Sequence, residues 1–217
     1  MDDYWFKPYR GTVISYNTLR RLVGIIGMAL PVVLVFGSFW LLKKPIGPSI
    51  SSYYHTDLRD WFVGSMWAFG VFLMAYRLGR LDNALATVAG VLAILVSLFP
   101  TASDDTAAGA RPLTATLHLV CAATFFALLA VLSYLFAVPR DGYNPSPRHR
   151  RAHKTCAGVI MASLIISGAV ILSTGKDVET ESIWVFLLET AGILAFGVSW
   201  FMTGRPLIPE AVRTLSR

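Results

Sequence analysis

Six long apolar runs are the feature that most limits what this chain can fold into. They cover residues 22–42, 60–76, 84–101, 113–137, 155–174 and 183–203. Each run is close to the ~20 residues that cross a bilayer as an α-helix. Backbone polar groups within a bilayer must bond inside their own segment, so runs of this length predict helices. Membrane-barrel strands would be about ten residues long and would alternate in polarity, which these runs do not.

The composition agrees with a membrane protein. Only 15% of the 217 residues are charged, against about 25% in a soluble domain. The mean hydropathy is +0.58. We therefore predict an all-α, polytopic membrane bundle of six transmembrane helices. Residues 1–21 are a predicted cytoplasmic N-terminal segment, 22–203 the six-helix domain and 204–217 a cytoplasmic tail.

The distribution of basic residues predicts an orientation. Of the 19 Lys and Arg residues, 14 lie before the first run, in the second and fourth connections, or after the sixth run. Positively charged segments stay on the cytoplasmic side, so both termini are predicted to be cytoplasmic. The formal charge of +6 is then mostly this bias, and we expect no nucleic-acid partner. The basic stretch "RHRRAHK" at 148–154 would add attraction to anionic headgroups.

An unusually polar passage, "PSISSYYHTDLRDWFVG" at 48–64, lies between the first two runs, on the predicted external side. Two ionisable residues fall at nearly the same depth in other helices. His118 is about five residues inside the fourth run, and Glu189 about six residues inside the sixth. At ~1.5 Å per residue both lie roughly 8–10 Å below the outer boundary. Ionisable groups are costly in a bilayer, so we predict an outer-leaflet polar cavity.

Three chemistries would suit such a cavity. His55, His118 and one carboxylate from Asp60, Asp104 or Asp105 would form a three-ligand zinc site with an open position. Glu189 and His118 could instead carry out acid/base chemistry without metal. In the third case no reaction takes place, and the groups bind a lipid headgroup or pass an ion or proton.

Structural roles compete with these chemistries. Arg59 and Asp60 could simply cap the second helix, with Asp60 favouring its dipole. Tyr53, Tyr54 and Trp61 are typical of an interfacial aromatic belt. Glu189 could pair with Arg59 or with a backbone carbonyl.

Other motifs have mainly structural interpretations. His149 and His153 have the i, i+4 spacing of a metal pair, but the surrounding positive charge predicts a solvated basic face. Ala86 and Gly90 form a small-xxx-small pair suited to close helix contact. Residues 138–151 contain three prolines and are predicted to be a mobile cytoplasmic loop. The two cysteines lie near opposite ends of their helices, so no disulfide is expected between them.

Several motifs resemble known families. "PSISS" at 48–52 and "FLMAYR" at 72–77 resemble the six-span proteins that include the DRAM-like and GPI-anchor lipid-remodelling groups. "YYHT…RD.FVG" at 53–64, "LFPT" at 98–101 and "FGVSW…G" at 196–204 resemble uncharacterised bacterial membrane proteins. The first resemblance implies lipid chemistry. The second implies a bacterial inner membrane and no particular activity.

A partial resemblance to the ceramidase and adiponectin-receptor superfamily rests on Ser51-xxx-His55, with Asp60 as a second element. The family's His-xxx-His element is absent, because Ala122 stands four residues after His118. That family would also have seven spans.

We predict a protein that binds or modifies a membrane lipid from the outer leaflet. If it is an enzyme, the predicted reaction is hydrolysis. An ion- or proton-coupled transporter or channel, and a non-enzymatic assembly or sensor protein, remain alternatives. Homo-oligomerisation is left open. The predicted catalytic residues are Glu189, His118 and Asp60. The predicted substrate-binding residues are Ser51, Tyr54 and Arg59. The predicted metal ligands, with zinc as the cofactor they would hold, are His55, His118 and Asp60.

Overall fold

The computed structural model describes residues 16–75, 79–102, 112–140, 144–173 and 183–203. They form α1 (Tyr16–Gly37), α2 (Arg59–Met74), α3 (Arg80–Leu98), α4 (Leu113–Leu135), α5 (Pro147–Ser173) and α6 (Ile183–Thr203). A π-helical turn, η2 (Ser38–Leu42), continues α1, and a 3₁₀ turn, η3 (Ser51–His55), precedes α2. These ranges contain no β-strand, so the predicted all-α class is confirmed.

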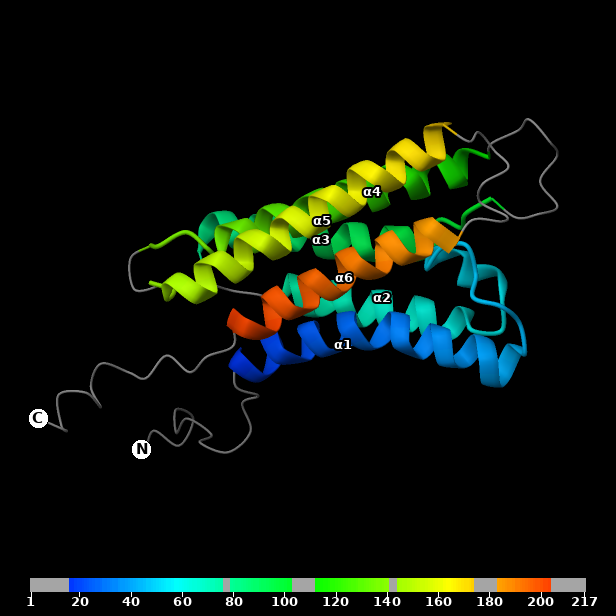
Figure 1. Ribbon diagram of the computed structural model, residues 1–217, viewed down its shortest axis with the longest axis horizontal. Helices are drawn as coiled ribbons and strands as arrows, with labels where there is room; N and C mark the ends of the chain where they lie inside the picture. The colour runs from blue at the N-terminus through cyan, green and yellow to red at the C-terminus, as the bar shows by residue number, and fades with distance from the viewer. Residues whose placement is uncertain (1–15, 76–78, 103–111, 141–143, 174–182, 204–217) are drawn as a thin grey trace, which may run out of the picture.

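The six helices form one elongated bundle in which consecutive helices run in opposite directions (Figure 1). Each helix packs against its neighbours in the chain, and α1 also packs against α6, so the helices close into a ring. A smaller contact between α4 and α6 crosses this ring. The start of α1 and the end of α6 lie at one end of the bundle, and the segment joining η2 to α2 lies at the other (Figure 1).

Five helical segments are long and apolar enough to cross a bilayer. They are Arg21–Leu42, Arg80–Leu98, Leu113–Leu135, Pro147–Ser173 and Ile183–Thr203. Large apolar side chains on these segments point away from the bundle, among them Val120, Ile165 and Phe201. Such a surface is unfavourable in water and suits lipid. The chain is therefore an integral membrane protein, although α2, with 16 residues, is shorter than the other helices.

Glycines allow two helix pairs to approach closely. A Cβ added to Gly70 on α2 would lie 2.6 Å from the carbonyl oxygen of Gly90 on α3. Gly24 on α1 faces Gly197 on α6 in the same way, with a Cβ–oxygen distance of 2.8 Å. Such contacts let backbones pack together where lipid provides no hydrophobic drive for association. The predicted contact surface around Ala86 and Gly90 is confirmed, since Ala86 is also fully buried.

Aromatic side chains fill the centre of the ring. Phe69 on α2 packs against Phe125 on α4 and Phe196 on α6, with ring centroids 5.8 and 5.5 Å apart. Leu129 and Ile160, from α4 and α5, are completely buried beside this layer. Both cysteines are buried and free, as the positions of their helices predict.

Part of the predicted loop at 138–151 is helical, and residues 141–143 lie outside the described ranges. Its last residues belong to α5, which begins at Pro147 because Ser146 accepts a hydrogen bond from the backbone N–H of His149 and thereby caps the helix. Earlier in the same segment, the Arg140 guanidinium forms an ion pair with Asp82, at the start of α3. Asp82 is completely buried, and Arg140 also donates to the carbonyl of Leu135. This ion pair ties the end of α4 to the start of α3.

Removing one partner of this ion pair should cost more than removing both. Arg140→Ala leaves a buried carboxylate without its counter-charge, which costs about 3 kcal/mol of unfolding free energy. The double variant Asp82→Ala, Arg140→Ala should recover most of that loss. Denaturant unfolding in detergent micelles measures both. Equal stability of the single and double variants would show that the ion pair carries no such coupling.

Candidate functional site

The polar passage that follows α1 is folded by its own serines. Ser49 Oγ accepts a hydrogen bond from the backbone N–H of Ser52, and Ser52 Oγ donates to the Ser49 carbonyl at 2.6 Å. Serine favours such local bonds at the start of a helical turn, and η3 begins here. Thr56 acts similarly at the next turn, where its Oγ1 accepts from the N–H of Leu58 just before α2. The passage is therefore a compact turn.

Tyr53 anchors this turn to α1. Its hydroxyl lies 2.5 Å from Ser38 Oγ, in the π-helical turn η2, and accepts a hydrogen bond from the Gly47 N–H. Only 1% of Tyr53 is exposed. Its assignment to an aromatic belt is therefore wrong. Trp61, with 59% of its surface exposed, keeps an orientation that such a belt requires.

The turn is held against α6 by two further bonds. The carbonyl of Pro48 accepts from the Phe186 N–H, one of the first four amides of α6, which have no partner within the helix. The N–H of Ile50 donates to Glu189 Oε2 at 2.6 Å. This distance is at the short end of the range for N–H···O hydrogen bonds in proteins. Glu189 thus binds the polar turn to the transmembrane core.

His118 is fixed from the other side by the end of α3. Its Nδ1 lies 3.0 Å from the Val96 carbonyl oxygen and 2.7 Å from that of Phe99. Val96 needs this partner because the residue four positions later is Pro100, which has no N–H to complete the helix. Since carbonyl oxygens only accept, Nδ1 carries the proton. In the neutral ring Nε2 is therefore an acceptor.

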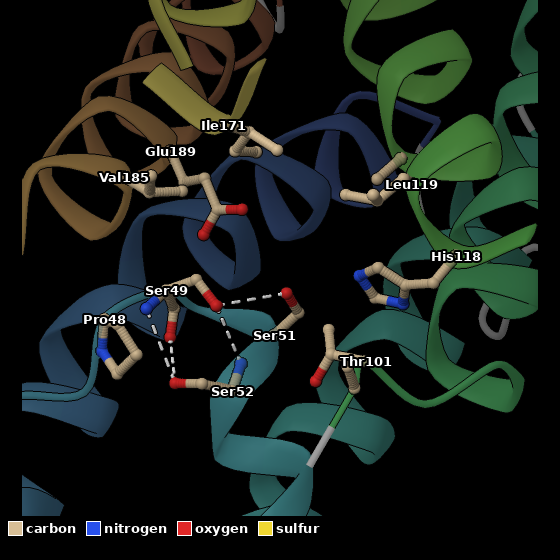
Figure 2. A pocket seen from close by; sticks show the side chains of 12 residues that line it. Pro48, Ser49, Ser51, Ser52, Thr101, His118, Leu119, Ile171, Val185 and Glu189 are labelled. Atoms are coloured by element: carbon tan, nitrogen blue, oxygen red, sulfur yellow. Dashed lines mark hydrogen bonds between the residues drawn. The ribbon is translucent and has the colours of Figure 1, made fainter. Parts of the chain in front are cut away.

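These elements enclose a cavity of about 60 Å³. Residues from the turn, the end of α3, and helices α4, α5 and α6 line it, and they are Pro48, Ser49, Ser51, Ser52, Thr101, Ala102, His118, Leu119, Ala122, Ile171, Val185 and Glu189. Figure 2 shows the His118 imidazole and the Glu189 carboxyl group pointing into the cavity from opposite sides, with Ser51 below them. A cavity needs roughly 10–15 Å³ of such volume to hold one water molecule, so this cavity is small, with room for a few waters.

The structure brings together only some of the predicted site residues. Ser51, His118 and Glu189 line the cavity. His55 is exposed, but its Nε2 lies 3.0 Å from the carbonyl oxygen of Thr101, which is part of the cavity wall. Tyr54 is half-buried and packs edge-on against His55.

Arg59 and Asp60 do not line the cavity. They lie 3.6 Å apart at the start of α2, with 58% and 92% of their side chains exposed. Within the described ranges, no three His, Cys, Asp or Glu side chains are grouped to hold a metal ion. The ligand set of His55, His118 and Asp60 is therefore not assembled, and Asp104 and Asp105 lie outside those ranges.

A second buried histidine was assigned incorrectly. His153, interpreted as part of a solvated basic face, is only 1% exposed. Its Nδ1 lies 2.8 Å from Ser199 Oγ, and its ring packs edge-on against Phe136. This contact joins α5 to α6, and the start of α5 and the end of α6 lie at the opposite end of the bundle from the segment that joins η2 to α2 (Figure 1). His149 and His153 are four residues apart, so their side chains point in similar but not identical directions. The charged residues beside them in the sequence do not show which of the two histidines faces the bundle.

Comparison with known proteins adds no family to this description. No protein-family model, no curated protein and no solved structure gives a significant match to this chain.

Removing the Glu189 carboxyl should release the polar turn. In Glu189→Ala the Ile50 amide loses its acceptor, whereas Glu189→Gln retains one. We expect the amide hydrogens of residues 47–56 to exchange roughly tenfold or more faster in the alanine variant, and less so in the glutamine variant. Hydrogen–deuterium exchange of the protein in nanodiscs measures this. Asp60→Asn, at an exposed position, is the matched control, and equal exchange in all variants would rule out this anchoring role.

Proposed function

We propose that the protein crosses the membrane six times, with both termini in the cytoplasm and the cavity near the external face. The alternating directions of the six helices and the unequal distribution of basic residues support this topology. α2 extends about 24 Å at ~1.5 Å per residue, somewhat less than the ~30 Å hydrocarbon core. It packs between α1 and α3, and Trp67 and Val71 on its outer face are exposed to the surroundings. A short span of this kind is tolerated within a bundle by local thinning of the bilayer.

The function proposed for this protein is binding of the polar end of a membrane lipid or a similar amphiphile. The main observation in its favour is that one part of the cavity wall is polar and another part is apolar. The turn, His118 and Glu189 supply polar groups, whereas Leu119, Ala122, Ile171 and Val185 supply an apolar wall. Sites for small molecules combine an apolar lining with a few placed polar groups in this way.

The position of the cavity supports a ligand that comes from the bilayer. Ile171 lines the cavity near the outer end of α5, and the next residue, Leu172, is 86% exposed. The apolar wall is thus one residue away from a surface that lipid would cover. A volume of about 60 Å³ is well below the roughly 300–1,000 Å³ of sites that enclose whole small molecules. The cavity fits one end group, with the apolar chain remaining in the bilayer.

Hydrolysis without metal is the chemistry that this site supports best. His118 Nε2 faces the cavity as an acceptor because its other nitrogen is held by two carbonyl oxygens. A fixed imidazole of this kind can accept the proton of an attacking water, with a carboxyl group on the opposite wall. Glu189 occupies that wall (Figure 2).

Transport through the bundle is less well supported. Phe125, Leu129, Ile160 and Phe196 are buried within the ring and together fill its centre with apolar side chains. A conducting path would need polar groups or water at this level. The cavity is better described as a site open to one membrane face.

Filling the cavity should weaken binding. Ala122→Leu places a larger side chain in the apolar wall without changing a polar group, and Ala123→Leu adds the same side chain at an exposed position of α4. In nanodiscs made with total lipid from the expressing cells, native mass spectrometry should detect a bound amphiphile on the wild type and on Ala123→Leu. We expect roughly tenfold less on Ala122→Leu. An equal amount on Ala122→Leu, or none on the wild type, would contradict the proposal.

A further inference from the structure

We propose that the end of α1 beside the polar turn carries a binding site for an anionic phospholipid. The site consists of the apolar side chains of Phe39, Trp40 and Leu41 and the ammonium groups of Lys43 and Lys44. It shares no residue with the described lining of the cavity, so it is a second site. The phosphate of the lipid would lie at the lysines, and its acyl chains would run along the apolar side chains.

Three consecutive large apolar side chains are exposed at this end of α1. The exposed fraction is 56% for Phe39, 78% for Trp40 and 69% for Leu41. Of the five residues of η2, only Ser38 is buried. Because consecutive helical residues point in widely different directions, exposure of three in a row means that this turn projects from the bundle. An apolar surface of this kind indicates a contact with a membrane or with another protein.

The projecting turn is held in a fixed conformation. Ser38 Oγ lies 2.5 Å from the Tyr53 hydroxyl, which ties η2 to the polar turn. The Ser38 carbonyl accepts hydrogen bonds from the backbone N–H groups of Lys43 and Lys44. Lys43 has a φ of 51°, in the left-handed region, and this conformation ends the helix. The two lysines therefore follow directly on the apolar turn, at the point where the helix stops.

The order of apolar and charged groups matches the structure of a phospholipid. The segment Arg21–Leu42 has 22 residues and extends about 33 Å at ~1.5 Å per residue, enough to cross the ~30 Å hydrocarbon core. Lys43 and Lys44, both exposed, then fall at the level of the headgroups, where tryptophans such as Trp40 are also favoured. Ammonium groups at this level attract anionic lipids. A zwitterionic headgroup offers less net attraction, because its own cation offsets the phosphate.

The charged residues of the neighbouring helix leave this site positive. The start of α2 lies against the end of α1, since a Cβ added to Gly37 would lie 2.6 Å from the Leu58 side chain. It brings the exposed charges of Asp57, Arg59 and Asp60. Arg59 and Asp60 lie 3.6 Å apart and offset each other. Asp57 opposes only one of the two lysines, so the sum over these residues remains positive.

Two photoreactive phospholipids test this site. They have the same acyl chains with a diazirine near the glycerol, and they differ only in their headgroups, which are those of phosphatidylglycerol and phosphatidylcholine. Both are present in equal amounts in nanodiscs that contain the full-length wild type or a variant. After irradiation and pepsin digestion, mass spectrometry measures the ratio of the two labels on residues 36–42.

We expect the anionic label to exceed the zwitterionic label roughly fivefold or more on this segment of the wild type. The double variant Lys43→Gln, Lys44→Gln should bring the ratio close to one. The double variant Arg150→Gln, Arg151→Gln is the matched control. It removes two exposed charges at the start of α5, at the other end of the bundle (Figure 1), and should leave the ratio on residues 36–42 unchanged.

Three results would overturn the proposal. One is a ratio close to one in the wild type, and another is a ratio that the lysine variant does not change or that the control lowers equally. The third is weak labelling of this segment by both lipids, because another protein chain would then cover the surface. Labelling on residues 36–42 is separate from amphiphile binding in the cavity, which Ala122→Leu tests.

Discussion

The bond from the Ile50 N–H to Glu189 is the interaction on which the rest of the site depends. It joins residues 139 positions apart and fixes the polar turn over the start of α6. A carboxyl group at this depth in a bundle is costly without a partner, and an amide without an acceptor is also costly. Each group therefore satisfies the other. The same contact holds Ser49 and Ser51 in the cavity wall, so the shape of the cavity depends on the turn being held in place.

Much of this architecture could be predicted from the sequence because the bilayer restricts a chain so strongly. An apolar run of about twenty residues has to be helical, and its length alone gives the depth of a residue within it. Counting along the fourth and sixth runs was enough to place His118 and Glu189 at one level, and both line the cavity. The second run, residues 60–76, is the shortest of the six, and the corresponding helix, α2, is also the shortest.

The direction of side chains could not be predicted in the same way. Helices that face lipid are apolar on most sides, so hydrophobic periodicity does not show which face points inward. Asp60 was assigned to the cavity and is 92% exposed, whereas His153 was assigned to the surface and is buried. The fold of the turn was not predicted either. The Tyr53 hydroxyl bonds to Ser38 in the π-helical turn η2, and no short sequence motif indicates such a turn.

The chemistry of His118 follows from how the neighbouring helix ends. Pro100 cannot donate to Val96, so the last turn of α3 leaves a carbonyl oxygen that needs a donor inside an apolar bundle. The imidazole supplies that donor, and the choice of nitrogen sets which one remains available as an acceptor. The "LFPT" motif and His118 are therefore two parts of one feature, although 18 positions separate the proline from the histidine. A residue with an N–H at position 100 would compete with His118 for the Val96 carbonyl oxygen and so weaken the hydrogen bond that orients the imidazole. The end of α3 thus determines which nitrogen of a histidine on α4 can accept a proton.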